Sequence, residues 1–119
     1  VSEITAPVTI GANAFVEDSV IDEVITGTGV IFDDTDISTL KVASVFVYNE
    51  GAQPVTLSLQ ISPTANDAHY IDDPNYTDFV VDALSGKYIS VSLFAHYFRL
   101  QYNMGGDTGT ISAYFNGQA

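Results

Sequence analysis

The clearest pattern in this sequence is an alternation of apolar and polar residues over positions 54–62. Apolar side chains stand at every second position, with Thr, Ser and Gln between them: Val55, Leu57, Leu59 and Ile61. A period of two that is kept over this length is typical of a β-strand with one face in the core and one face in water. We therefore expect a half-buried strand here.

A second apolar run, at positions 42–48, precedes this strand. The two runs are separated by Asn49 to Gln53, a linker that contains Gly51. Two strand-like runs joined by five residues that include a glycine favour a β-hairpin. The sequence therefore predicts a central hairpin around which the rest of the fold is arranged.

The N-terminal segment 1–14 alternates in the same way, and its apolar face consists of small side chains. Those residues are Ile4, Ala6, Val8, Ile10, Ala12 and Ala14. Pro7, on the other face, has no N–H to donate to a neighbouring strand, which predicts an edge strand or one paired on one side only. Two interpretations stay open: the segment pairs within its own subunit, or it is donated to the sheet of a neighbour.

The remaining chain predicts further short strands. Residues 17–27 fit either a strand with a bulge or one helical turn ending at Gly27, and their β-branched side chains favour the strand. Alternating apolar positions near the C-terminus add further core residues: Phe98, Leu100, Ile111 and Phe115. We expect an all-β protein with one antiparallel β-sandwich of jelly-roll or immunoglobulin-like kind, formed by eight or nine short strands over residues 15–119 and extended by the N-terminal strand.

The charge of the chain excludes several classes of partner. Fifteen acidic residues against three basic ones give a formal net charge of −12. Nucleic acids and anionic membranes are bound through clustered cations, which this sequence lacks, and no apolar run is long enough to span a bilayer. The chain has no cysteine, so disulfides and thiolate metal sites are excluded. Frequent Thr and Ser with few Lys favour an extracellular location.

Several short motifs after position 45 resemble a known group of proteins. They are Phe46-Val47-Tyr48-Asn49, Pro54-Val55-Thr56-Leu57, Gln60-Ile61-Ser62-Pro63, Phe98-Arg99-Leu100-Gln101-Tyr102 and Ala113-Tyr114-Phe115. This order resembles small β-sandwich domains of surface- and spore-associated proteins of Gram-positive bacteria. It is also similar in architecture to jelly-roll subunits of endospore appendages, and that resemblance implies fibres assembled through an extended N-terminal segment. Those subunits use N-terminal cysteines to lock neighbours together, and this chain has none.

Acidic turns provide candidate ligands for Ca²⁺, a cation that prefers several clustered oxygens. The candidate residues are Asp33, Asp34, Asp36, Asp72 and Asp73. Their spacing does not match an EF-hand, and solvated turn carboxylates are the alternative interpretation. No other cofactor is expected.

Three tyrosines in or next to the loops, Tyr70, Tyr76 and Tyr97, provide a candidate platform for stacking against a glycan. Interface tyrosines are the alternative. The two histidines, His69 and His96, have no second histidine at metal-ligand spacing, and no serine stands in a Gly-x-Ser-x-Gly turn. We therefore expect a protein that is not an enzyme.

Two functions fit these observations. The first is a structural subunit of an extracellular filament or surface appendage on a cell or spore. Its only partner is itself, and neighbours are joined without covalent bonds by the donated N-terminal strand. The alternative is a monomeric extracellular module for adhesion or glycan binding.

Overall fold

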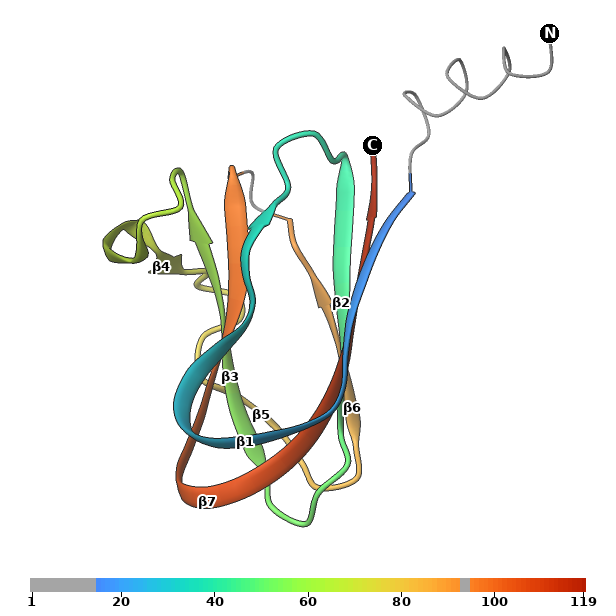
Figure 1. The fold of residues 1–119 in the computed structure, drawn as a ribbon, viewed down its shortest axis with the longest axis vertical. Helices are drawn as coiled ribbons and strands as arrows, with labels where there is room; N and C mark the ends of the chain where they lie inside the picture. The colour runs from blue at the N-terminus through green and yellow to red at the C-terminus, as the bar shows by residue number, and fades with distance from the viewer. Residues whose placement is uncertain (1–14, 93–94) are drawn as a thin grey trace, which may run out of the picture.

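The computed structural model describes residues 15–92 and 95–119, so the predicted donor strand at 1–14 lies outside the described residues. Within them, seven strands and one short 3-10 helix follow one another along the chain (Figure 1). They are β1 (Phe15–Asp36), β2 (Val42–Asn49), β3 (Val55–Ser62), the 3-10 helix η2 (Asp67–His69), β4 (Ile71–Asp72), β5 (Phe79–Val81), β6 (Gly86–Ser90) and β7 (Tyr97–Gln118). The predicted all-β class is confirmed.

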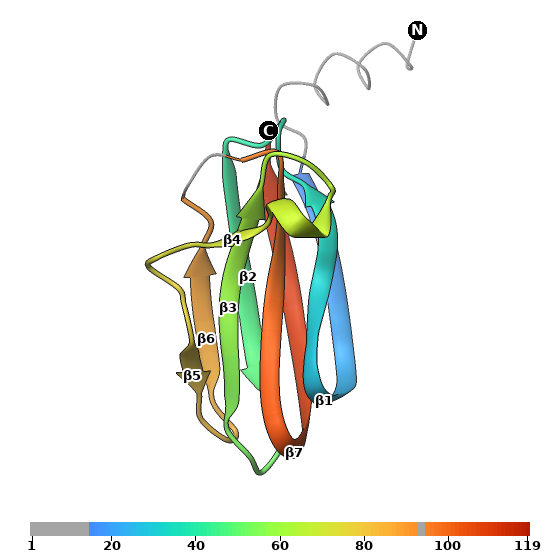
Figure 2. The same ribbon diagram turned by 90° about the vertical axis from the view of Figure 1, so that its left-hand side faces the viewer.

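Two of these strands are much longer than the sequence pattern predicted. β1 and β7 have 22 residues each, pair with each other along their length, and bend back on themselves near the middle (Figures 1 and 2). Each therefore crosses from one layer of the sandwich to the other. The expected eight or nine short strand segments are thus joined into seven strands, because two long strands each replace a pair of short ones.

Glycines make this shared bend feasible. Thr26 pairs with Thr108 and Thr28 with Asn103, so four residues of β7 lie opposite the single Gly27 of β1. Gly27 and Gly105 have positive φ angles of 62° and 61°, a conformation that side chains with a Cβ rarely adopt. The glycine-rich segment 105–109 is therefore the corner of a folded sheet.

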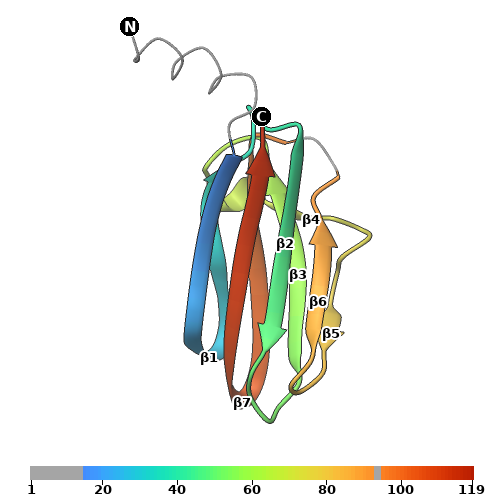
Figure 3. The same ribbon diagram turned by 90° about the vertical axis from the view of Figure 1, so that its right-hand side faces the viewer.

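The bend produces two facing layers from one continuous antiparallel sheet. One layer consists of β6, β2, the second half of β7 and the first half of β1 (Figure 3). The other consists of β3 with β4 and β5, the first half of β7 and the second half of β1 (Figure 2). The arrangement is consistent with the predicted jelly-roll type of sandwich.

The predicted central hairpin is wrong. β2 pairs with β6 and β7, whereas β3 pairs with β4, β5 and β7, so the two strands lie in opposite layers. The linker between them is an arch over one end of the sandwich. The buried amide of Asn49 holds this arch: its Nδ2 donates to the carbonyls of Gln53 (2.7 Å) and Val81 (3.0 Å), and its Oδ1 accepts from the N–H of Gly51 (3.0 Å).

The eight core residues named from the sequence are all buried between the layers. Phe98 and Phe115 stack with ring centroids 5.1 Å apart, and Phe32 packs 6.3 Å from each of them. Phe32 reaches this position because β1 has a register irregularity between Ile31 and Thr35, where Phe32 adopts a φ of 55°. Burial of a large ring offsets the strain of this backbone conformation.

The polar face of β3 is not in water as the alternation predicted. Ser58, Gln60 and Ser62 are buried, because the segment that contains η2, β4 and β5 covers this side of the strand. Ser58 Oγ accepts from the N–H of Asp78 (2.9 Å), and Gln60 Nε2 donates to Asp72 (2.9 Å). The burial of these polar groups costs little free energy because each has a hydrogen-bond partner.

The segment 17–27 is a strand with a bulge. The pairing of β1 with β7 shifts between Val20 and Glu23, and Asp22 in the bulge has a φ of 51°. Of the two interpretations of this segment, the strand is therefore the right one. No helix among the described residues is long and apolar enough to cross a membrane.

Candidate functional site

Arg99 lies at the centre of the charged cluster formed by the predicted acidic turns. Its Nη1 is 3.0 Å from Asp67 Oδ1 and 3.6 Å from Asp33 Oδ1, and its Nε donates to Gln60 Oε1 at 2.8 Å. The guanidinium also lies over the ring of Tyr70, 4.0 Å from its centroid. Arg99 therefore joins β7, β3 and η2 through one side chain.

The hydroxyl of Tyr70 completes this cluster by donating to Asp34 Oδ1 at 2.7 Å. Burial raises the pKa of Tyr70 well above its ordinary value, and the hydrogen bond to Asp34 and the negative charges of Asp34 and Asp33 act in the same direction. Tyr70 thus remains a neutral donor throughout the physiological pH range.

Only part of the predicted metal set is brought together. Asp33 and Asp34 lie with Asp67 so that one carboxylate oxygen from each is within 4.8 Å of the others. These three residues are the ones that could hold a cation such as Ca²⁺. Arg99 already places a positive charge beside Asp67 and Asp33, and this charge opposes a second cation.

The other predicted ligands have separate roles. Asp36 accepts from the N–H and Oγ of Ser38, and these hydrogen bonds lower the pKa of its carboxyl group, as does nearby His96 to a smaller extent. Asp72 is bonded to Gln60. Asp73 is fully buried and accepts from the N–H of Asn75 at 2.9 Å. Asp36, Asp72 and Asp73 are not in the carboxylate group around Arg99.

The predicted tyrosine platform is not assembled. Tyr70 is buried under Arg99, Tyr76 packs edge-on against Phe79, and Tyr97 stacks on the ring of His96 at 4.1 Å. Among the described residues, no two of these three tyrosines stack on each other. Each ring is used by its own local contact.

A different set of aromatic residues covers the outer face of the layer in Figure 3. We call it the outer aromatic face, and it consists of Phe46, Tyr48, Tyr88 and Tyr114. The Phe46 and Tyr88 rings are 5.1 Å apart, and those of Tyr48 and Tyr114 are 6.0 Å apart. Tyr48, Tyr88 and Tyr114 are exposed. The sequence analysis missed this face, although aromatic residues that alternate with core residues in three strands are a signal for it.

The two open edges of this layer differ in charge and regularity. The first half of β1 forms one edge and has four acidic residues and no basic residue: Glu17, Asp18, Asp22 and Glu23. Its pairing with β7 is also interrupted between Val20 and Glu23. Charges and bulges on an edge strand prevent the addition of a further strand.

β6 forms the opposite edge and has none of these protections. It contains no acidic residue and one lysine, Lys87, and it pairs only with β2 among the described residues. The N–H of Ser90 faces the hydroxyl of Tyr76 (3.4 Å), away from β2, so by the alternation of the strand the N–H of Tyr88 also points outward. The outward N–H of Ser90 is already bonded to Tyr76, so it is at Tyr88 that this edge can accept another strand.

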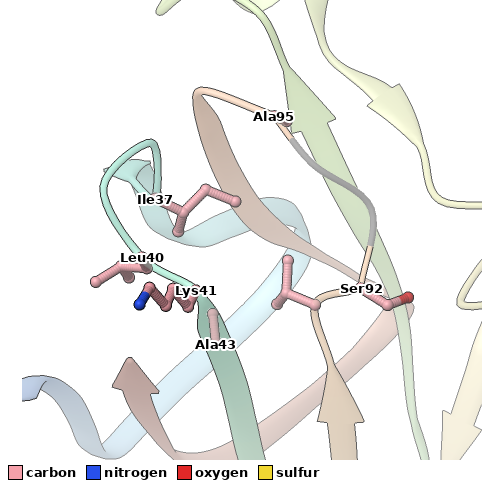
Figure 4. A pocket seen from close by; sticks show the side chains of 7 residues that line it. Ile37, Leu40, Lys41, Ala43, Ser92 and Ala95 are labelled. Atoms are coloured by element: carbon pink, nitrogen blue, oxygen red, sulfur yellow. The ribbon is translucent and has the colours of Figure 1, made fainter. Parts of the chain in front are cut away.

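A cavity of about 160 Å³ lies just beyond the end of β6 (Figure 4). Five apolar side chains line it together with Lys41 and Ser92: Ile37, Leu40, Ala43, Val91 and Ala95. The N–H of Lys41 donates to the carbonyl of Gln118, whose strand partner is Phe15. The cavity is therefore at the same end of the sandwich as the start of β1.

The comparison with family models decides the family. The model of DUF6385, a domain of unknown function, matches residues 36–119. The chain belongs to the DUF6385 family. No curated protein matches the sequence.

Solved structures show which folds the DUF6385 chain is similar to. The PBSX exported protein XepA has a TM-score of 0.64 at 16% identity, over 87% of this chain and 37% of its own. PirA has a TM-score of 0.56 at 13% identity, over 86% of this chain and 92% of its own. A chain from the structure titled "Bacillus endospore appendages form a novel family of disulfide-linked pili" has a TM-score of 0.47 at 18% identity, over 89% of each chain. The present chain thus spans about 37% of the length of XepA, and the likeness to XepA and PirA is one of fold.

Proposed function

We propose that this chain is a structural subunit of an extracellular filament or surface appendage, in which residues 1–14 of one copy add as a strand to β6 of the next. The observation that carries the proposal is the contrast between the two sheet edges. β1 is long, acidic and interrupted, whereas β6 is short, open and free of acidic residues. Of the two edges of this layer, the β6 edge is therefore the one that favours strand addition.

The sequence of the donor segment fits this acceptor edge. Its small apolar side chains, from Ile4 to Ala14 at alternate positions, would face the interior, and Glu3 is its one charged residue. A strand laid along β6 ends beside Val91, which lines the cavity beyond the end of β6. Pro7, which lacks an N–H, suits a strand that is paired on one side only.

The positions of the two edges are compatible with a head-to-tail assembly. The donor segment precedes β1, and β1 and β6 are at opposite edges of the layer, with β7 and β2 between them. Three strand spacings, about 14 Å, therefore separate the donor's attachment point from the acceptor of the same copy. A heterologous contact of this kind that does not close on itself generates a filament.

The location and the conditions of assembly belong to the same proposal. XepA is described as an exported protein, which is in keeping with an extracellular site for this fold. At a net charge of −12, subunits repel one another at low ionic strength. Filaments should therefore form more readily in 500 mM than in 10 mM salt, because the range of charge interactions is roughly sevenfold shorter at the higher salt concentration.

Two matched variants of the acceptor strand test the proposal by negative-stain microscopy and sedimentation. Tyr88→Pro removes the outward N–H of β6 without removing a bond to β2, and it should abolish filaments. Tyr88→Ala removes the same ring but keeps the N–H, and it should still form filaments.

The donor segment is tested separately. Deletion of residues 1–12 should leave a monomer, and a peptide of those residues should bind it and raise its thermal midpoint. A truncated chain that still polymerises, or a wild-type chain that stays monomeric at high concentration and high salt, would contradict the proposal.

A further inference from the structure

The outer aromatic face lies beside a row of polar side chains that runs across the same strands. Register pairs place Tyr88, Phe46 and Tyr114 in one row over β6, β2 and β7. Two residues further along each strand, a second row contains Ser90, Ser44, Asn116 and Glu17. The rows are about 7 Å apart, and four strands span about 14 Å. An aromatic track and a hydrogen-bonding track thus run side by side across the outer face of this layer.

The polar track has unused hydrogen-bonding capacity. Within the described part of the chain, the side chains of Ser44, Asn116 and Glu17 make no hydrogen bond to another residue, although an amide and a carboxylate offer several donor and acceptor positions. Beside them, Glu17, Ser19, Tyr114 and Asn116 line a shallow groove of about 420 Å³. The groove joins the two tracks at the β1 side of the face.

The charges near this face select the kind of ligand. None of the three basic residues belongs to either track, and Lys87 instead places its Nζ 5.8 Å from the ring centroid of Phe79. Glu17 and the adjacent Asp18 repel anionic ligands. At low ionic strength a second copy of the chain, with its own net charge of −12, is repelled as well. A neutral ligand with an apolar face and many hydroxyl groups meets neither obstacle.

The geometry points to a binding site for a neutral polysaccharide on the outer aromatic face. The C–H faces of successive sugar rings pack on Tyr88, Phe46 and Tyr114, as apolar surface does on exposed aromatic rings. Their hydroxyl groups exchange hydrogen bonds with Ser44, Asn116 and Glu17. This site is separate from the outward amides of β6 that the filament proposal uses, so a filament subunit can hold glycan along its length.

Affinity electrophoresis of the full-length protein tests the site. Native gels contain hydroxyethyl cellulose, galactomannan or laminarin as neutral probes, alginate as the anionic probe, or no polysaccharide. Mobility is taken relative to the gel without polysaccharide, so any effect of polymerisation cancels. We expect retardation in at least one neutral gel, and binding about two- to tenfold weaker for Tyr114→Ala. Tyr97→Ala, which alters an aromatic residue outside both tracks, should leave binding unchanged.

A second variant keeps the test valid if Tyr114→Ala folds poorly. Asn116→Ala leaves every ring in place and should also weaken binding to the neutral probe. Three results overturn the site: no retardation in any neutral gel, retardation that neither Tyr114→Ala nor Asn116→Ala reduces, or retardation by alginate alone. Sedimentation of the same samples separates the two proposals, because glycan binding without filaments contradicts only the filament.

Discussion

The buried amide of Asn49 offers the sharpest test of how the two layers are joined. In the Asn49→Ala variant, the carbonyls of Gln53 and Val81 lose their donor and the N–H of Gly51 loses its acceptor. Val81 is buried, so its carbonyl stays unpaired, at a cost of about 1–3 kcal/mol. Gln53 is exposed and Gly51 is half-buried, so water replaces most of those bonds and adds about 1 kcal/mol. We expect a loss of about 2–4 kcal/mol in the free energy of unfolding.

The Asn49→Asp variant gives the same test a pH dependence. A carboxylate at this position keeps the bond to Gly51 but places negative charge against the carbonyl oxygens of Gln53 and Val81. Burial and these oxygens raise the pKa of the new carboxyl group in the folded state above its unfolded value. The folded state is therefore favoured below the unfolded pKa and loses stability as the pH rises. We expect Asn49→Asp to be less stable than Asn49→Ala at neutral pH and to recover in acid.

Urea denaturation followed by far-UV circular dichroism and tyrosine fluorescence measures both variants, because the chain has seven tyrosines and no tryptophan. Ser44→Ala, on the outer face of the same strand, is the control and should change the stability by less than about 0.5 kcal/mol. An Asn49→Ala variant as stable as Ser44→Ala, or an Asn49→Asp variant whose difference from wild type is the same at every pH, would refute the role assigned to this amide.

Two further predictions concern the core and the charged cluster. Leu59→Ala should lower the free energy of unfolding by about 2–5 kcal/mol. Thr56→Ala, at a half-buried position on the other face of β3, should lower it by less than about 1 kcal/mol. The reverse order in urea denaturation would show that the core-facing side of β3 is assigned wrongly. Above about pH 10 the wild type should lose stability, because unfolded Tyr70 ionises there and folded Tyr70 keeps its proton. Tyr70→Phe should reduce that loss, and equal pH profiles for the two proteins would count against the bond to Asp34.

Local alternation was enough to predict the class of fold and the interior of its main strands. Leu57 and Leu59 are fully buried, as the period of two in their segment predicted, because a pleated strand places alternate side chains on the same face. The bulged strand in β1 follows from its β-branched residues in the same way. These features depend on neighbours in the sequence, so the sequence alone determined them.

Strand pairing was decided by the tertiary structure. The linker at Asn49–Gln53 has the length and the glycine of a hairpin turn, yet β2 and β3 each pair with a different half of β7. A turn sequence predicts that the chain reverses its direction, but it does not predict which strands then pair. Whether the two strands then pair with each other depends on which other strand pairs with them, and that strand, β7, lies about fifty residues later in the sequence.

The candidate functional surfaces were likewise predictable from the sequence only in part. The sequence provided the acidic turns and the apolar face of segment 1–14, but it did not place Arg99 among the carboxylates or unite Phe46, Tyr88 and Tyr114 into one face. Each of these groups gathers side chains from strands that are distant in the sequence. The sequence determined which side chains the surface contains. Cross-strand pairing sets which residues lie side by side. The folding of one long sheet around the bends of β1 and β7 therefore decided which of those side chains meet.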